Sequence, residues 1–259
     1  MRYIDVHCHI NEEDYGSTEI LLNNIKTAGV EKIISVGFDL QSSEYCKDLA
    51  EKFDWVYFTA GFHPTELKKY EEGALDGIAR LAKHKKCVAI GEIGLDYHYP
   101  DTDKRLQHRI FKEQLRLAEE LKMPVQIHSR DCAEDMLGIL REYAPRLRYG
   151  AMLHCYSHSS ELAKEFEKLG LYFSFGGTST WSGSKKAKRT ISALPSDKIL
   201  TETDSPYLPP KSKYGTFPNT PESIPEIAEN IAEIKGMSLS EFSETVWNTA
   251  HKLFYKLNN

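Results

Sequence analysis

The sequence predicts an α/β protein whose 259 residues form a single domain, a (β/α)8 or TIM barrel. Short runs rich in β-branched and aromatic residues alternate with longer amphipathic segments along the whole chain, which is typical of parallel βαβ units. Eight such units favour a closed barrel, which typically needs about 250 residues. An open doubly wound sheet is the alternative, but no Gly-x-Gly-x-x-Gly follows the first predicted strand.

Each element of this barrel can be placed in order along the chain. Strands are predicted at residues 2–7, 32–36, 55–60, 87–92, 124–128, 149–154, 172–174 and 199–202. Helices are predicted at residues 17–28, 42–53, 103–121, 132–143 and 159–169, and residues 221–257 are expected to form two further helices that cover the barrel. The segment 103–121 is the clearest helix, because its apolar residues recur at helical spacing between charged ones. Gly29, Gly170 and Gly236 stand where helix C-caps are expected.

The composition narrows the class of protein. Hydrophobic residues make up 41% and charged residues 27% of the chain, which suits a globular protein with a sizeable core. No signal peptide is evident, and no apolar run approaches the roughly 18–20 residues that cross a bilayer, so we expect no membrane partner. Five cysteines without a Cys-x-x-Cys pair argue against a disulfide framework, and we expect a cytoplasmic monomer. The net charge of -5 argues against a general nucleic-acid coat but is compatible with a local basic patch.

Polar side chains with metal-binding or acid–base chemistry follow most of the predicted strands. They are His7, His9, His63, Glu92, Asp96, His128, Arg130, His154 and Asp204. Residues two apart on a strand point to the same face, so His7 and His9 are expected to project together. Active sites of (β/α)8 barrels form at the carboxyl ends of the strands, so all of these side chains would share one mouth, roughly ten ångströms across.

So many ionisable groups predict a metal centre, because burying them without compensation would be costly. The candidate ligands are four histidines and two carboxylates: His7, His9, Glu92, His128, His154 and Asp204. Six ligands suit two divalent cations about 3.5–4 Å apart better than one tetrahedral zinc. We expect His7 and His9 to hold one cation, His128 and His154 the other, and Glu92 to bridge them. Asp204 would bind the first cation and accept a proton from a metal-activated water, which makes Asp204 and Glu92 the candidate catalytic residues. Magnesium, manganese, zinc or another first-row ion would fit these ligands.

Six short motifs, in order, resemble the TatD family of metal-dependent deoxyribonucleases in the amidohydrolase superfamily. They are D-V-H-C-H, G-F-H-P, G-E-I-G-L-D-Y, Q-I-H-S-R, L-H-C-Y-S and T-E-T-D-S-P-Y-L, and the resemblance covers about residues 2 to 257. It implies a TIM barrel, a divalent-metal centre at the six ligand positions above and hydrolysis of phosphodiesters in DNA. It also implies that His63 and Arg130 meet the substrate phosphate, and that Asn219 and Pro221 form a turn that closes over the site.

The segment after the seventh strand, GGTSTWSGSKKAKR, departs from the family pattern by its length and polarity. If a helix begins near Ser184, its amides could receive a phosphate, and Lys185 and Lys186 would add positive charge as substrate-binding residues. The alternative is a solvated loop with a basic helical face. Trp181 in this segment could stack a base or only anchor its own loop. A second cationic and aromatic segment, with Lys211, Lys213 and Tyr214, could track a strand's backbone or stack a base.

The leading functional prediction is a metal-dependent phosphodiesterase that removes nucleotides from a DNA end. A first alternative is an amidohydrolase acting on a C–N or lactone bond of a small molecule. Many such enzymes bridge their metals with a carboxylated lysine, where this chain offers Glu92. A trinuclear phosphoesterase is a second alternative, but the late T-E-T-D-S lacks its Asp-x-His. A non-catalytic metal-binding protein would have no need of an open, bridged pair of cations.

Overall fold

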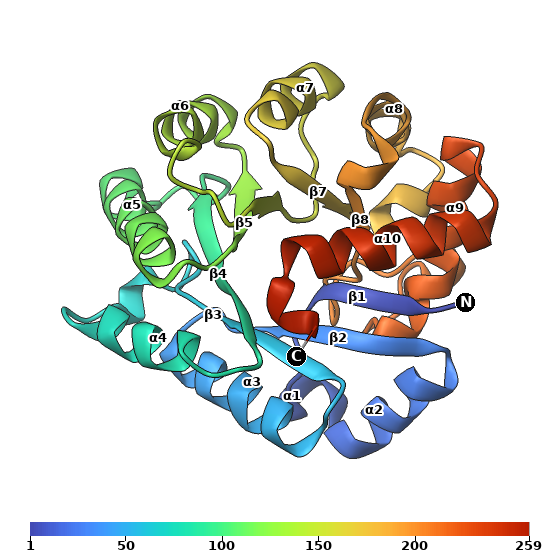
Figure 1. Ribbon diagram of the computed structural model, residues 1–259, viewed down its shortest axis with the longest axis horizontal. Helices are drawn as coiled ribbons and strands as arrows, with labels where there is room; N and C mark the ends of the chain where they lie inside the picture. Colours follow the sequence, from blue (N-terminus) through green and yellow to red (C-terminus); the bar gives the residue numbers. More distant parts are fainter. Residues whose placement is uncertain (259) are drawn as a thin grey trace.

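The computed structural model describes residues 1–258, which form one sheet of eight parallel strands curled into a barrel. Neighbours in the chain are neighbours in the sheet, so each strand pairs with the next (Figure 1). The strands are β1 (Tyr3–Cys8), β2 (Val30–Val36), β3 (Val56–Ala60), β4 (Cys87–Asp96), β5 (Val125–Arg130), β6 (Ala151–Leu153), β7 (Tyr172–Phe175) and β8 (Ile199–Thr201). The predicted (β/α)8 barrel is therefore confirmed, with strand ends that differ from the prediction by at most four residues.

Helices follow each strand and surround the barrel. They are α1 (Glu12–Tyr15), α2 (Thr18–Thr27), α3 (Leu40–Lys52), α4 (Ala74–Ala82), α5 (Lys104–Leu121), α6 (Ala133–Tyr143), α7 (Ser160–Lys168), α8 (Lys185–Ala193), α9 (Ile224–Lys235) and α10 (Leu239–Leu253). Several begin at polar caps visible in the sequence: the side chains of Ser17, Asp103 and Ser159 accept hydrogen bonds from the first turns of α2, α5 and α7. The helix expected near Ser184 is present as α8.

Strand β4 is longer than predicted, because two glycines of G-E-I-G-L-D-Y let it lie very close to β5. A Cβ on Gly94, whose φ is +147°, would lie 2.0 Å from the carbonyl oxygen of His128. A Cβ on Gly91 would lie 2.8 Å from the Cβ of Gln126. The β4–β5 register shifts between Ile90 and Ile93, and such an irregularity turns the intervening side chain relative to a regular strand. The motif that looks like a strand end and a loop thus remains paired with β5 as far as Asp96.

The barrel closes between β1 and β8 through a buried carboxylate. Asp5 Oδ1 accepts hydrogen bonds from the amides of His7 and Thr203, both at 3.1 Å, and Oδ2 accepts one from the Thr203 hydroxyl at 2.5 Å. The amide of Asp204 donates to His7 O at 3.0 Å, and the amide of His9 donates to Ser205 O at 2.7 Å. These bonds hold the ends of β1 and β8 side by side and fix the positions of His7 and His9 relative to Asp204.

The two C-terminal helices have different places in the fold. Helix α9 packs beside α8 and completes the outer ring, and α10 crosses the strand ring in Figure 1. The turn after α10 contacts residues that precede or begin strands: Tyr255 Oη donates to Lys122 O, and Lys256 Nζ donates to Ala82 O. Both helices contact β1 and β8, as expected for helices that cover the barrel, and α10 with this turn also closes the end opposite the polar mouth. Among residues 1–258, no helix is long and apolar enough to cross a membrane.

Candidate metal centre

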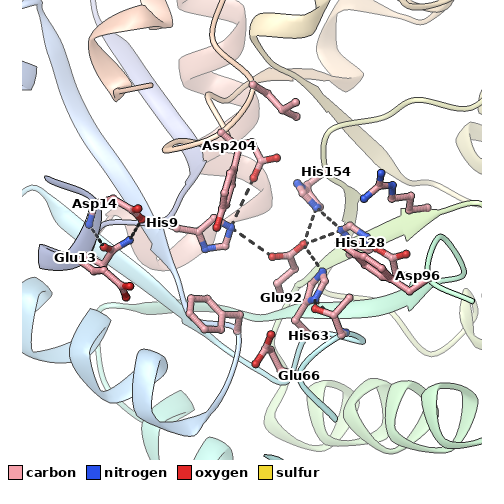
Figure 2. Close-up of a pocket in the computed structure, with 17 residues that line it drawn as sticks. His9, Glu13, Asp14, His63, Glu66, Glu92, Asp96, His128, His154 and Asp204 are labelled. Carbon is pink, nitrogen blue, oxygen red and sulfur yellow. Dashed lines mark hydrogen bonds and ion pairs between the residues drawn. The ribbon is translucent and has the colours of Figure 1, made fainter. Parts of the chain in front are cut away.

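The carboxyl ends of the strands surround an open cavity of about 620 Å³. Figure 2 shows that side chains from opposite walls of the barrel point toward one another across it. Of the residues predicted from the sequence, the following line it: His9, His63, Glu92, Asp96, His128, Arg130, His154 and Asp204. His7 lies beneath them and is fully buried.

His7 and His9 each have one ring nitrogen held by the protein and the other directed into the cavity. His7 Nδ1 lies 2.9 Å from Gln126 Oε1, and His9 Nδ1 lies 3.0 Å from Val36 O. These partners are acceptors, so in the neutral rings each Nδ1 carries the proton and each Nε2 presents a lone pair. The two Nε2 atoms are 3.3 Å apart, and both lie within 3.7 Å of Asp204 Oδ1. Lone pairs and a carboxylate that face one another at this distance repel, and a cation among them removes the repulsion.

Three more histidines meet Glu92 from the other side. Glu92 Oε1 lies 2.7 Å from His154 Nε2, 3.0 Å from His128 Nδ1 and 3.4 Å from His63 Nε2. The far nitrogen of His128 is 2.9 Å from Asp96 Oδ2, and that of His63 is 2.7 Å from the Thr65 hydroxyl. Asp96 thus keeps a proton on His128 Nε2 and leaves Nδ1 available as a ligand.

Glu92 divides its two carboxylate oxygens between these groups of histidines. Its Oε2 lies 3.6 Å from both His7 Nε2 and His9 Nε2, and Oε1 faces the other three rings. The side chain is 4% exposed, so water screens it little. Burial alone would raise the pKa of Glu92, but the His63 and His154 imidazoles and the hydrogen bonds from His128 and His154 hold it well below its usual range.

The other groups also show that the cavity attracts positive charge. Burial opposes protonation of His154, but Glu92 and Glu202 raise its pKa well above the usual value. Asp96 and Glu92 likewise overcome burial and raise the pKa of His128, and Asp204 and Glu92 do the same for His9. For Asp204, burial is outweighed by the surrounding histidines, so its pKa is lowered. Anions and imidazoles that stabilise added protons are the donor set that binds divalent cations.

The potential ligand atoms form three compact groups among the described residues. These are His7, His9 and Asp204; His63, Glu92 and His128; and His7, His154 and Glu202. The first matches the ligand set expected for one cation. The second includes His63, which was expected to meet the substrate phosphate and which here lies close enough to share a ligand group. Burial keeps the pKa of His63 below its usual value, so its ring is neutral. The Thr65 amide donates to His63 Nδ1 at 3.2 Å, so the proton of the neutral ring is on Nε2, which faces Glu92 Oε1.

Glu202 was not predicted as a site residue, although it alternates with Asp204 in T-E-T-D-S. It is fully buried, and its Oε2 accepts a hydrogen bond from the Ser174 hydroxyl at 2.6 Å. The same oxygen lies 3.7 Å from His154 Nδ1. Within residues 1–258, His154 Nδ1 and Glu202 Oε1 have no hydrogen-bond partner. Glu202 therefore lies behind His154 on the side away from Glu92, but at 3.7 Å it is farther from the ring than Gln126 is from His7.

The structure places the residues expected to bind substrate at different positions and does not bring all of them to the metal cavity. Arg130 lines the metal cavity. Lys186 lines a second cavity, formed by the loops after β6, β7 and β8, and Lys185 is exposed on α8. Asn219 is fully buried, and its side chain donates to Thr203 O and Tyr207 O. The Asn-x-Pro turn therefore supports the β8 loop from within and does not cover the site.

A (β/α)8 barrel whose mouth gathers histidines and carboxylates around a central glutamate is typical of metal-dependent hydrolases. Known proteins support this class. Residues 4–255 match the family model for TatD related DNase. The chain is 38% identical to YabD of Bacillus subtilis (strain 168), described as an uncharacterized metal-dependent hydrolase, over 96% of this chain and 98% of YabD. It is 32% identical to a protein of the same description, YcfH of Escherichia coli K12, over 98% of this chain and 96% of YcfH.

The fold agrees with these relatives. The crystal structure of YjjV, a TatD homologue from Escherichia coli K12, superposes with a TM-score of 0.91 at 30% identity, and the match covers 98% of both chains. The protein therefore belongs to the TatD family of metal-dependent hydrolases.

Proposed function

We propose that this protein is a phosphodiesterase that uses two divalent cations to remove nucleotides from the end of a DNA strand. The observation that carries the proposal is the arrangement around Glu92, where five inward-facing histidine nitrogens and Asp204 lie beside Arg130 in an open cavity. His7, His9 and Asp204 would hold one cation, and His128 and His154 the other, with Glu92 between them. When bound, the cations would lower the pKa of a water molecule and polarise the phosphodiester.

The chain itself supplies the remaining functions. Arg130 brings a permanent positive charge to the cavity lining, and its planar guanidinium suits two oxygens of a phosphodiester. The Asp204 carboxylate is 15% exposed and has a lowered pKa, so it is ionised and able to accept a proton from water. The left-handed backbone of Asp204, with φ of +51°, turns the chain sharply at this point, a conformation common for Asp among non-glycine residues.

The rim of the cavity supports cleavage near a strand end. Glu13, Asp14 and Glu66 line the cavity, and Lys69 pairs with Glu66 at 2.7 Å, so Glu13 and Asp14 carry most of the negative charge of the rim. Figure 2 shows these two beyond His9, on the side away from His154. These carboxylates would repel the phosphates of a strand that ran across them, whereas a terminal nucleoside carries none beyond the scissile one. The five cysteines are free thiols, which supports work in the reducing cytoplasm. We expect the enzyme to act as a monomer, because one chain supplies all the ligands.

The test is digestion of 5′-labelled and 3′-labelled single-stranded oligonucleotides with magnesium, manganese or EDTA. The proposal expects ladders that shorten by one nucleotide, require metal and vanish in Glu92→Ala. Lys164→Glu, on the exposed face of α7, is the matched control for a charge change away from the site. If the folded, metal-loaded enzyme leaves both labels uncut, the proposal is wrong, and a panel of small amides, esters and lactones should identify the substrate class.

A further inference from the structure

A second cavity, of about 760 Å³, lies beside the metal centre on the same end of the barrel. Three loops form it: Tyr156 and Ser157 follow β6, Trp181 follows β7, and Lys211 and Tyr214 follow β8. The beginning of α8 completes the wall with Lys186. Cationic and aromatic residues that stand far apart in the sequence thus face one space.

The aromatic part of this cavity is partly fixed and partly open. Trp181 Nε1 donates a hydrogen bond of 2.8 Å to Pro209 O, which anchors the indole. The ring of Tyr214 meets the indole edge to face, with centroids 5.3 Å apart, and Tyr214 is 70% exposed. Such an exposed ring beside an anchored one offers a stacking surface that any nucleobase can use.

The cationic part suits a phosphate. Lys186 Nζ donates to Ser157 O at 3.2 Å, which places the ammonium at the cavity wall. An ammonium has three donors, so two remain for a phosphate. Lys211 adds a second positive charge from the β8 loop.

The two cavities are neighbours along two stretches of chain. Leu208 lines the metal cavity and Lys211 the second one, and three residues of chain span at most about 11 Å. On the other side, His154 lines the metal cavity and Tyr156 the second one. A short oligonucleotide held at the metal centre could therefore reach the second cavity.

Charge favours a path of the strand from the metal centre toward the second cavity. Glu13 and Asp14 lie on the side of the metal cavity away from His154 (Figure 2), whereas Lys186 and Lys211 line the second cavity. Phosphates beyond the scissile one are repelled by the first side and attracted by the second.

We propose that the second cavity is a binding subsite for single-stranded DNA, which holds one base against Trp181 and Tyr214 and an adjoining phosphate against Lys186 and Lys211. The subsite binds the remaining, shortened strand and not the nucleotide that cleavage releases. This inference rests on the proposed phosphodiesterase function.

The first experiment compares kcat/KM for thymidine dinucleotide and octathymidylate in Lys186→Glu and Tyr214→Ala. The dinucleotide is too short to fill both sites, so the wild type should prefer the octamer. Each variant should reduce this preference about tenfold, the scale expected for loss of one stacked base or one phosphate contact. Lys164→Glu on α7 and Tyr149→Ala before β6 are the matched controls, and both should keep the wild-type preference.

A second experiment measures binding without cleavage, by fluorescence anisotropy of a labelled phosphorothioate octathymidylate that resists hydrolysis. Lys186→Glu and Tyr214→Ala should weaken binding about tenfold, and the controls should not. Thermal unfolding of each variant shows that it is folded.

The outcomes separate the two proposals. If the enzyme cleaves both substrates and the variants keep the wild-type preference, the subsite is wrong and the phosphodiesterase stands. If neither substrate is cleaved, the proposed function is wrong, and the anisotropy then decides the cavity: selective weakening in the two variants supports a nucleic-acid site, and equal binding overturns it.

Discussion

Asp96→Ala tests whether the carboxylate behind His128 sets the metal affinity of the site. Asp96 is 2% exposed, and its Oδ2 lies 2.9 Å from His128 Nε2. This contact leaves His128 Nδ1 free beside Glu92 Oε1, at 3.0 Å. Removing the hydrogen-bond partner of a ligating histidine typically lowers metal affinity 10–100-fold, or about 1.4–2.7 kcal/mol.

The assay is calorimetric titration of the metal-stripped protein with Mn²⁺ and Zn²⁺. Asp96→Ala should bind 10–100-fold more weakly than wild type, and Asp96→Asn should lose less, because its amide oxygen can still accept the hydrogen bond. Asp101→Ala is the control, since that carboxylate is 70% exposed and pairs with Lys68. Asp96 also accepts a hydrogen bond from the His98 amide, so thermal unfolding must show that Asp96→Ala is folded at the assay temperature. Equal affinity in a folded Asp96→Ala would refute the assigned role.

Three further predictions concern stability. Asp5→Ala should lower the free energy of unfolding by about 3 kcal/mol, because three hydrogen bonds to a buried carboxylate are lost. In urea unfolding, Asp5→Ala should lose more free energy of unfolding than Thr203→Val, which removes one of these bonds. Asp39 caps α3, and hydrogen bonds from Ser42 and Lys69 outweigh burial to lower its pKa, so Asp39→Ala should cost about 1 kcal/mol above pH 4. This difference in unfolding free energy should shrink as the pH falls through the folded-state pKa; a difference that persists in acid would contradict the assignment. Chelation by EDTA should lower the midpoint of thermal unfolding in calorimetry, since a cation at 100 times its Kd contributes about 2.7 kcal/mol, and an unchanged midpoint would argue against a bound metal.

The barrel could be predicted from the sequence because strand and helix periodicities are local. Alternating apolar runs, polar helix caps such as Ser17, and C-cap glycines are visible within a few residues of each element. The length of β4 could not be predicted, because the fit of Gly94 against His128 O depends on a neighbour far along the chain. The different places of α9 and α10 depend likewise on long-range packing.

The candidate ligands could be predicted because each follows an apolar run, and the structure gathers them at one mouth. The residues that lie behind these ligands were harder to predict. Gln126 and Glu202 stand two residues before His128 and Asp204, a spacing that does point to a shared face of the strand. The acidic rim could not be predicted, because α1 is only four residues long and Glu66 lies in a turn without periodicity. Nor does the sequence show that Trp181, Lys186 and Tyr214 share a cavity, since only tertiary packing joins their loops.

The seam between β1 and β8 has a consequence for synthesis on the ribosome. Asp5 and Thr203 are 198 residues apart, so β1 emerges long before the strand that it must join. Until β8 and α10 follow, the nascent chain has one edge of its sheet unpaired and His7 and His9 without Asp204. A protein made in order from its N-terminus therefore brings its six candidate metal ligands together only near the end of translation.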